Sequence, residues 1–531
     1  MNQEARDASN LVPGRWERQS NWAVHLVQLF FLGVMLFQLD APFLSAHNER
    51  QNQTFDMARH VFRDGWRSVI TPKVSYCIPG FEKEPVTAVL QEVPFHGLLG
   101  WPLVLATGHE RAAVRIVSTV FALLSIQLLY WILRFWLPPV VSALGAAIWA
   151  TAPLVLHFGQ VPMPDILCAT GILAAFWFAL RGKLPASSGC FGFAILAKMS
   201  VIVFGLPVLV ALLVARNCNS LRDFLRLSLL WGWFPLLSLA TWEIVLYSFA
   251  PSTPMSVVQI WQEGKPWSLF AHLVIYKFLL GCIFPFGIGV LGMAGLLFAV
   301  RAEKSPMDAR IKWAIIVSNL IFLAFVIRKV AEPQYVLQML PWFVIGASFG
   351  LDYFLKKLCA GIGWRIGFGM VLILHILVAL FFTMDLKTSR VHNLPDIERA
   401  GELLPPDARV VVIYRFYGAG PAVWLDRNVV PMGVPDRLEE SFTRLQAEGF
   451  SHVLILDIES LHNRRSAKDP QALLARIIGA VGRAPSIENA NMPAFTDPAG
   501  PFRQFCDRNF SQMFAAPHVV LYSIAPWHAK N

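Results

Sequence analysis

The chain has 531 residues, of which 55% are hydrophobic and only 15% are charged, and its mean hydropathy is +0.51. Because a soluble domain carries about a quarter charged residues, this composition excludes an ordinary soluble globular protein and indicates a membrane protein. The net charge of +10 does not indicate a nucleic-acid partner. Lys and Arg form no single stripe but lie between apolar segments, where the positive-inside rule places them.

The N-terminal segment, residues 1–21, is polar and is predicted to be cytoplasmic. The first apolar run, 22–39, lacks a small-residue cleavage site and therefore predicts an uncleaved first helix. A spanning helix needs about 20 mostly apolar residues. Eleven segments fit this requirement, some of them only in part: 22–39, 112–136, 140–157, 165–180, 187–199, 201–216, 226–249, 281–300, 312–328, 335–354 and 366–383.

The apolar segment 86–107 is predicted to lie on the outer membrane surface and not to span it. It contains Glu92 and two prolines, which would be costly facing lipid. Segment 268–280 is interpreted in the same way. With both excluded, most Lys and Arg residues of the short loops fall on the inner side, as the positive-inside rule requires. The long loop 40–111 then lies outside.

The polar tail, residues 384–531, is predicted to be a small extracytoplasmic α/β domain that follows a transmembrane catalytic domain, 22–383. Runs rich in β-branched residues alternate in the tail with runs of helical spacing, which is typical of a sheet covered by helices. The fold class is therefore an α-helical polytopic membrane protein of about 11 spans with this added domain. The expected strands are 409–414, 452–456 and 519–524, and the expected helices are 436–448 and 470–481.

The seven cysteines are scattered and form no Cys-x-x-Cys pair, so zinc and redox sites are not indicated. Cys77 and Cys506 both fall in segments placed outside. A disulfide between them is an alternative that the sequence leaves open.

The outer loop 40–111 concentrates acidic and basic residues at the membrane surface. A solvated loop that merely carries its share of charge is the plain alternative. The residues that could carry chemistry here are His47, Glu49, Arg50, Gln53, Asp56, Glu82, Lys83 and Glu84.

Three further features lie on the same side of the membrane. Asp165 opens the span 165–180, either as a helix cap or partner of the helix dipole or as a functional acid. Lys198 lies at an outside turn, where it could extend to the interface or bind phosphate. Arg328 and Lys329 are adjacent cations outside, against the positive-inside trend, and a phosphate partner would explain them.

Acids from two outer loops and cations from three match the needs of transfer from a sugar phosphate. A carboxylate can deprotonate or orient the acceptor, and cations can bind the phosphate and stabilise the charge that develops as the glycosidic bond breaks. The tail contains no glycine-rich phosphate loop. A lipid carrier that delivers the sugar through the bilayer would make a nucleotide pocket unnecessary.

In these places the sequence resembles the GT-C superfamily of membrane glycosyltransferases, over roughly residues 22–350. The likeness is greatest to the bacterial group related to the protein O-mannosyltransferases and the lipid A aminoarabinose transferase. The first-loop pattern is matched at four positions, with Gln53 where that pattern has Asp. The matching residues are His47, Arg50, Gln51 and Thr54; Phe81, Glu82, Lys83 and Pro85; Met163, Pro164 and Asp165; Lys198; and Pro333, Gln334, Tyr335 and Pro341.

The resemblance implies a polyprenyl-phosphate-linked sugar as donor and an inverting transfer to a lipopolysaccharide, glycan or protein acceptor. Glu49 is the favoured base, with His47 and Asp56 as competitors, and Asp165 would position the acceptor or share the acid–base role. No cofactor is required and no metal-ligand spacing is present, although the carboxylates could recruit a divalent ion. The implied location is the bacterial inner membrane, with site and tail facing the periplasm. The implied substrate-binding residues are His47, Arg50, Gln53, Asp56, Glu82, Lys83, Glu84, Lys198, Arg328, Lys329 and Tyr335.

Two other classes of protein remain as alternatives. A transporter or flippase of lipid-linked sugars would favour ionisable residues within the spans, but the spans here are poor in charge. A scaffold protein that binds partners through its tail would tolerate replacement of the loop acids.

Overall fold

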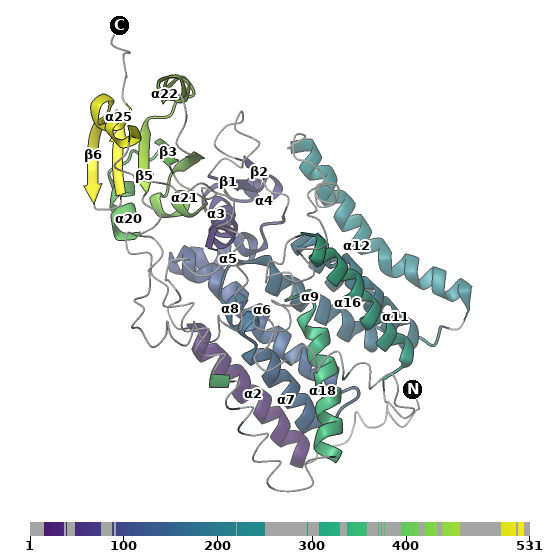
Figure 1. The fold of residues 1–531 in the computed structure, drawn as a ribbon. Helices are drawn as coiled ribbons and strands as arrows, with labels where there is room; N and C mark the ends of the chain where they lie inside the picture. The colour runs from purple at the N-terminus through teal and green to yellow at the C-terminus, as the bar shows by residue number, and fades with distance from the viewer. Residues whose placement is uncertain are drawn as a thin grey trace. The chain divides into compact units, whose positions relative to one another are not determined.

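The computed structural model divides into two compact units (Figure 1). The helical unit comprises Met1–Ala41 and Arg111–Asp385, and the loop–tail unit comprises Pro42–Glu110 and Leu386–Asn531. The long outer loop is therefore grouped with the C-terminal tail. The structure describes residues 15–36, 39, 48–75, 88–89, 92–218, 220–249, 295, 307–329, 337–357, 370, 373, 376–377, 394–413, 419–432, 438–456, 501–516 and 519–524.

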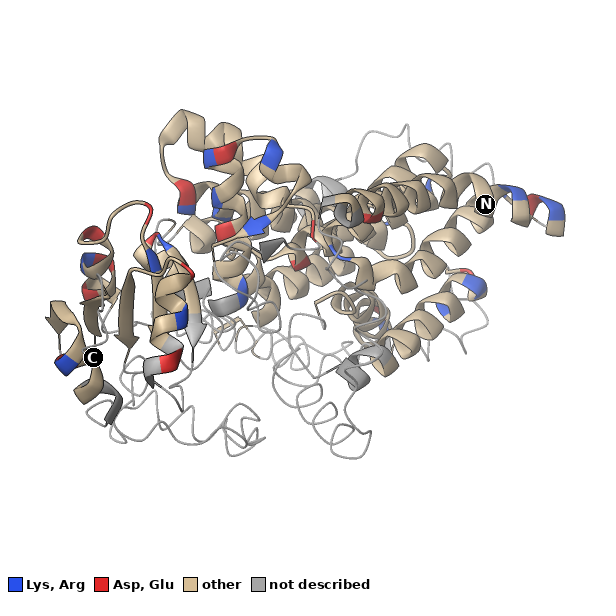
Figure 2. Cartoon of the chain, turned by 90° about the horizontal axis from the view of Figure 1, so that it is seen from above, with Lys and Arg blue, Asp and Glu red and all other residues tan. Residues whose placement is uncertain are grey.

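The helical unit consists of apolar helices with few charged side chains along their length (Figure 2). Proline occupies one of the first two positions of α7, α8, α9 and α10, where its missing N–H would have no partner in the helix. The elements are α2 (Arg15–Leu36), α6 (Glu110–Leu133), α7 (Pro139–Thr151), α8 (Pro153–Phe158), α9 (Pro164–Leu180), α10 (Leu184–Ala197), the 3₁₀ helix η2 (Met199–Phe204), α11 (Gly205–Ala215), α12 (Leu221–Phe249), α16 (Ala309–Lys329) and α18 (Leu340–Lys357).

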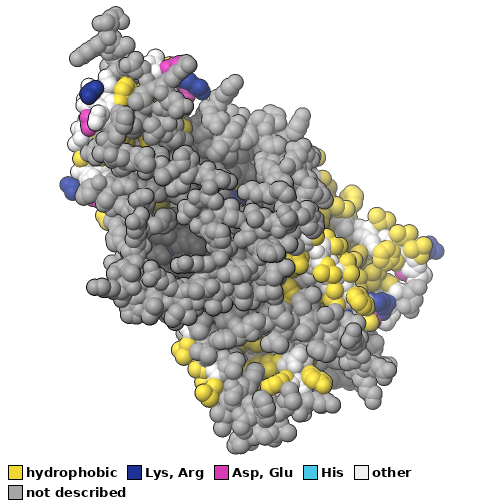
Figure 3. All heavy atoms as spheres, viewed as in Figure 1, with side chains coloured by type: hydrophobic (Ala, Val, Ile, Leu, Met, Phe, Trp, Pro, Cys, Tyr) yellow, Lys and Arg dark blue, Asp and Glu magenta, His cyan; other side chains and the backbone are white. Residues whose placement is uncertain are grey.

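Two helices in the described ranges are long and apolar enough to cross a membrane, Glu110–Leu133 and Leu221–Val245. Figure 3 shows hydrophobic side chains gathered on the face where α12 lies. Several large apolar side chains of α12 are exposed, as expected of a surface that meets lipid. The expected spans 281–300 and 366–383 fall almost entirely outside the described residues. The count of about 11 spans therefore stays a prediction.

The expected span 140–157 is interrupted, because α7 ends at Thr151 and α8 begins at Pro153. Ala152 between them is extended, with φ −62° and ψ 130°. Pro153 explains the break, since a proline disfavours helical conformation in the residue before it and has no N–H to donate. The sequence pattern alone did not place this interruption.

The loop–tail unit begins with two packed helices. Its first elements are α3 (Asn48–Asp64), α4 (Arg67–Ile70), the short antiparallel strands β1 (Lys73–Val74) and β2 (Ala88–Val89), and α5 (Phe95–Thr107). A Cβ at Gly97 of α5 would lie 2.8 Å from the Val61 Cβ and 3.0 Å from the Ala58 Cα of α3, so glycine permits this close approach. At 1.5 Å per residue α5 is about 20 Å long, similar to α7, so its placement on the membrane surface stays a prediction.

The tail forms a five-stranded mixed sheet in the order β4-β3-β5-β7-β6. β3 pairs in parallel with β4 and β5, whereas β7 pairs antiparallel with β5 and β6. Three strands and α22 occupy expected positions, but the edge strands β4 and β6 were not expected, and 470–481 lies outside the described residues. The elements are α20 (Leu394–Glu402), β3 (Arg409–Ile413), α21 (Ala419–Leu425), β4 (Asn428–Met432), α22 (Leu438–Ala447), β5 (His452–Leu456), α25 (Pro501–Asn509), β6 (Ser511–Ala516) and β7 (Val519–Ser523).

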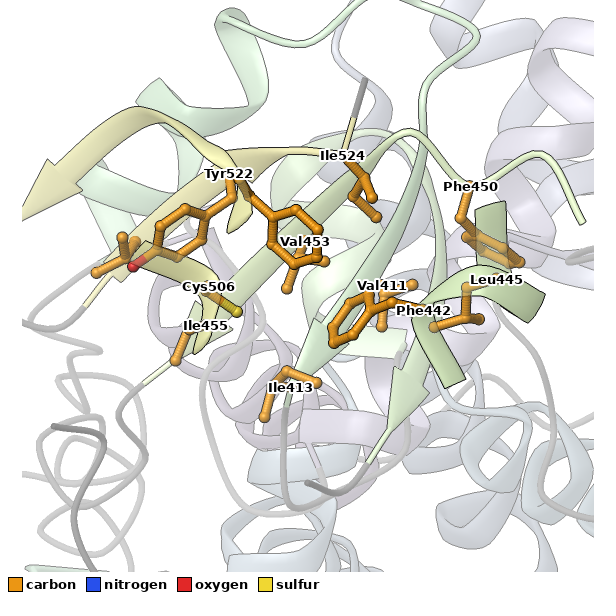
Figure 4. Close-up of a cluster of buried hydrophobic side chains, with 12 residues drawn as sticks. Val411, Ile413, Phe442, Leu445, Phe450, Val453, Ile455, Cys506, Tyr522 and Ile524 are labelled. Carbon is orange, nitrogen blue, oxygen red and sulfur yellow. The ribbon is translucent and has the colours of Figure 1, made fainter. Parts of the chain in front are cut away.

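One face of this sheet builds a hydrophobic core with α22 and α25 (Figure 4). Alternate residues of β3, β5 and β7 point into the core, as the two-residue period of a strand requires. Cys506 lies within it as a free, fully buried thiol. Burial, together with the nearby charge of Asp507, raises the pKa of Cys506 to about 12. The disulfide considered between Cys77 and Cys506 is therefore not formed.

Candidate active site

The helical unit holds a buried ion pair between Asp165 and Lys198. Asp165 lies in the first turn of α9, and Lys198 is an extended residue, φ −160° and ψ 110°, that separates α10 from η2. The Lys198 Nζ donates a hydrogen bond of 2.7 Å to the Asp165 Oδ1. The Asp165 side chain is 0% exposed and that of Lys198 is 11% exposed. The two residues selected from separate sequence motifs thus meet in the fold.

The helix cap and the solvent-extended lysine do not match the geometry, whereas Asp165, in the first turn of α9, does fit a partner of the helix dipole. The residue in the N-cap position of α9 is Met163, which makes no side-chain capping hydrogen bond, so Asp165 is not the cap. Lys198 does not extend its ammonium to solvent but donates it to a buried carboxylate. Taking two charges out of water costs several kcal/mol per ion even after relaxation. A charged pair that is buried inside an apolar helical bundle is therefore a candidate functional site.

One oxygen of the Asp165 carboxylate has no hydrogen-bond partner among the described residues. This oxygen, the Oδ2, is buried. A buried carboxylate oxygen can accept several hydrogen bonds, and leaving it without one is unfavourable. A hydroxyl or amine group of a substrate would satisfy it.

A second polar pair, missed from the sequence, belongs to the same unit. The Ser200 Oγ, two residues beyond Lys198, donates a hydrogen bond of 3.1 Å to the Gln338 Oε1 just before α18. The Gln338 side chain is fully buried, and its Nε2 has no hydrogen-bond partner among the described residues. Its position three residues after Tyr335, inside the stretch that carried the resemblance, was the available signal.

The start of α3 holds the first-loop candidates of the loop–tail unit. Glu49 lies in the first turn of this helix. Arg50 donates a hydrogen bond to the Gln53 Oε1 and forms an ion pair with Glu92, just before α5. Arg50 and Gln53 are therefore already organised by charge-assisted contacts at this end of the helix.

Asp56 lies one turn further along α3 and is fully buried. Its Oδ2 accepts a hydrogen bond from the Ser75 backbone N–H. His60 contacts the same loop residue, with its Nε2 2.9 Å from the Ser75 Oγ. Asp56 thus holds the loop that follows α4 against α3.

Several predicted site residues lie outside the described part of the structure. His47, Glu82, Lys83, Glu84 and Tyr335 are among them, as are the side chains of Glu49, Arg328 and Lys329. The predicted convergence of the first-loop acid with Asp165 therefore stays a prediction. Within the described ranges, no group of three or more His, Cys, Asp or Glu side chains could hold a metal ion.

We expect the loop–tail unit to lose stability as the pH falls below about 6.5, the ordinary pKa of histidine. Burial lowers the pKa of His96 in α5 to about 3. Because the unfolded chain binds the proton first, the stabilisation is complete above pH 6.5 and is lost progressively towards pH 3. Thermal unfolding measured across this range checks the effect. His96→Gln should reduce the slope of unfolding temperature against pH, and an unchanged slope would contradict the assignment.

The fold defined by these features is that of the GT-C membrane glycosyltransferases. ArnT from Cupriavidus metallidurans, in the structure bound to undecaprenyl phosphate, matches with a TM-score of 0.62 and 16% identity, covering 96% of this chain and 100% of that one. The same protein in the apo state matches with a TM-score of 0.60 and 16% identity, covering 95% and 98%. The oligosaccharyltransferase AglB from Archaeoglobus fulgidus, in complex with a peptide and a dolichol phosphate, matches with a TM-score of 0.54 and 11% identity, covering 83% and 70%.

A sequence comparison supports the same class. Residues 93–231 match the family model of the dolichyl-phosphate-mannose-protein mannosyltransferases. This match includes Asp165 and Lys198, and together with the similar structures it confirms the resemblance to the GT-C superfamily. No curated protein sequence was found to match the chain.

Proposed function

We propose that this protein transfers a sugar from a polyprenyl-phosphate-linked donor to an extracytoplasmic acceptor, with inversion at the anomeric carbon. The observation that carries the proposal is the buried Asp165–Lys198 pair, whose Asp165 Oδ2 has no hydrogen-bond partner in the described ranges. It combines an acid suited to orient a hydroxyl or amine with a cation suited to a phosphate.

The reaction proposed is a single displacement. An acceptor oxygen or nitrogen attacks the anomeric carbon, the bond from that carbon to the phosphate oxygen breaks, and the polyprenyl phosphate leaves with the electron pair. Glu49 takes the acceptor's proton as general base, and the Asp165 Oδ2 orients the acceptor. Because charge grows on the leaving phosphate, cations held in a low-dielectric site stabilise the transition state strongly. The proposed cations are Lys83, Lys198 and either Arg328 or Lys329, and Tyr335 donates to the same phosphate.

The remaining candidates have supporting places in this proposal. Arg50 and Gln53 present polar groups at the start of α3, where an acceptor would approach. His47, Asp56, Glu82 and Glu84 complete the proposed first-loop binding surface. The Gln338 Nε2 is a further donor to a phosphate oxygen or a sugar hydroxyl. No step requires a metal ion.

Two observations support this function over transport. The fold is shared over nearly the whole length with ArnT, which binds undecaprenyl phosphate in one of its structures, and over 83% of this chain with an enzyme complex containing dolichol phosphate. The described helices carry few charged side chains, unlike those of an ion-coupled transporter. The proposed location is the bacterial inner membrane, with the site facing the periplasm.

A transfer assay in detergent tests the proposal. The full-length protein is purified and incubated with undecaprenyl-phosphate-linked glucose, mannose and 4-amino-4-deoxyarabinose, each with a lipid and glycan extract of a strain lacking the gene. We expect one donor to release undecaprenyl phosphate together with a mass increase of one sugar on an acceptor. Because detergent removes the two compartments, a transporter gives no product in this assay. No release with any donor, from protein that binds undecaprenyl phosphate, would overturn the transferase proposal.

A further inference from the structure

The C-terminal end of α3 is fastened to the tail by one carboxylate, that of Asp426. The Arg63 Nη1 and Nη2 donate to the two oxygens of Asp426 at 2.8 and 3.1 Å, a bidentate arrangement. The Arg59 Nη1 donates to Asp426 Oδ1 at 2.8 Å as well. Bidentate guanidinium–carboxylate pairs fix orientation in addition to distance. These residues are more than 360 positions apart, so this is a tertiary clamp.

Neighbouring groups reinforce the two arginines. Arg59 is only 8% exposed, donates at 3.3 Å to the Val423 carbonyl oxygen, and lies 5.0 Å from the centre of the Phe55 ring. Glu110 lies within 3.4 Å of the Arg59 Nε and 3.5 Å of the Arg63 Nε. Burial opposes the charge of Asp426, yet the hydrogen bond from Arg63 and the charge of Arg59 hold the pKa of that carboxyl below its usual range.

The backbone at Asp426 is built for this contact. Asp426 has φ 55° and lies between the end of α21 at Leu425 and the start of β4 at Asn428. Few non-glycine residues adopt this left-handed conformation, and Asp and Asn are among those that tolerate it. A glycine would suit the turn equally well but would supply no carboxylate. The Asp426 side chain is therefore needed for its contacts with the arginines and not for the turn itself.

A second bridge runs between the same elements. The Val429 N–H of β4 donates at 2.8 Å to the Ser75 carbonyl oxygen, and Ser75 is held in turn by Asp56 and His60 of α3. The edge of the tail sheet is thus tied to α3 through the loop residue Ser75. Both bridges end on β4 or on the turn that precedes it.

We propose that Asp426 is a positioning residue, which through Arg59 and Arg63 orients α3 and thereby sets the place of Glu49, Arg50 and Gln53 at the helix's opposite end. The inference rests on the proposed function. Glu49 and Arg59 are separated by ten residues, about 15 Å along a helix. Because the helix is rigid, a small rotation at Arg59 also displaces Glu49. The tail then serves the reaction by holding a catalytic helix.

Asp426→Asn tests this in the full-length protein, because Asn tolerates the left-handed backbone and keeps the shape but lacks the charge. Asp407→Asn is the matched control, an exposed carboxylate of the same unit. With the donor that is active in the detergent assay, we expect kcat to fall about tenfold or more, since small misplacements of catalytic groups are costly, and the donor KM to change less than threefold. Hydrogen exchange in residues 48–64 should accelerate. Asp426→Glu should recover part of kcat.

The outcomes separate this inference from the proposed function. If Asp426→Asn keeps kcat within twofold while Glu49→Gln is inactive, the positioning role is wrong and the transferase stands. A raised KM at unchanged kcat also overturns the positioning role.

If wild-type protein transfers no sugar from any donor, the proposed function fails. Hydrogen exchange then still decides whether Asp426 orders α3, and an unchanged exchange rate rejects this role. Should Asp426→Asn not fold, Arg63→Met, which removes a half-exposed side chain, decides in the same comparison.

Discussion

Asp165→Asn is expected to lower the rate of sugar transfer by about 10²- to 10⁴-fold, the range over which acid–base groups contribute. The substitution keeps the size of the side chain at the start of α9 but removes the carboxylate that is proposed to orient the acceptor. The assay is release of undecaprenyl phosphate by purified protein. We expect kcat to fall while KM changes little, so that the rate is lowered by the same factor at all donor concentrations.

The same substitution also disturbs folding, so activity alone does not settle the role of Asp165. Breaking a buried ion pair from one side costs about 3 to 5 kcal/mol, because the remaining charge has no partner. Asp165→Asn and Lys198→Met should each lower the apparent unfolding temperature in detergent. The double variant replaces the pair with neutral groups of similar size, and its unfolding temperature should return towards that of the wild type.

The double variant is therefore the decisive control. If the pair acts in catalysis, the variant is stable but inactive. If the pair only balances charge within the apolar bundle, stability and transfer return together. Recovery of more than about a tenth of the wild-type rate would remove Asp165 and Lys198 from the mechanism, given the size of the loss expected for a catalytic acid.

The sequence predicted best those features that depend on short-range pattern. Strands β3, β5 and β7 follow from runs of β-branched residues, and α9 and α10 overlap the predicted apolar segments 165–180 and 187–199. Edge strand β4 was missed because Pro431 lies within it, and β6 because most of its side chains are exposed and polar or small. Edge strands lack the buried, alternating pattern on which such predictions rest.

The candidate site shows the same limit. Asp165 and Lys198 could be selected because each stands in a short motif, and their contact follows from the fold. Gln338 was missed because burial, and not residue type, marks it as unusual. Asp426 was missed because its partners, Arg59 and Arg63, lie in a loop hundreds of residues earlier. Long-range ion pairs leave no periodic signal in one sequence.

Glu49→Gln is expected to lower kcat by about 10²- to 10⁴-fold and to change the free energy of unfolding by less than about 1 kcal/mol. Glu49 lies in the first turn of α3. Replacing it with Gln therefore removes little stabilisation beyond the favourable interaction of its charge with the helix dipole. Asp56→Asn should give the opposite pattern. Its buried carboxylate accepts the Ser75 N–H, and loss of a hydrogen bond to a charged group costs about 1.5 to 3 kcal/mol.

Comparing these variants decides which first-loop residue is the base. His47→Gln provides the third arm, and each variant is compared by kcat, KM and apparent unfolding temperature. A large loss of kcat in Asp56→Asn at unchanged stability would transfer the role to Asp56, and the same result in His47→Gln would transfer it to His47. Because the buried Asp56 also supports the fold through its contact with Ser75, only a residue whose replacement lowers kcat without lowering stability qualifies as the base.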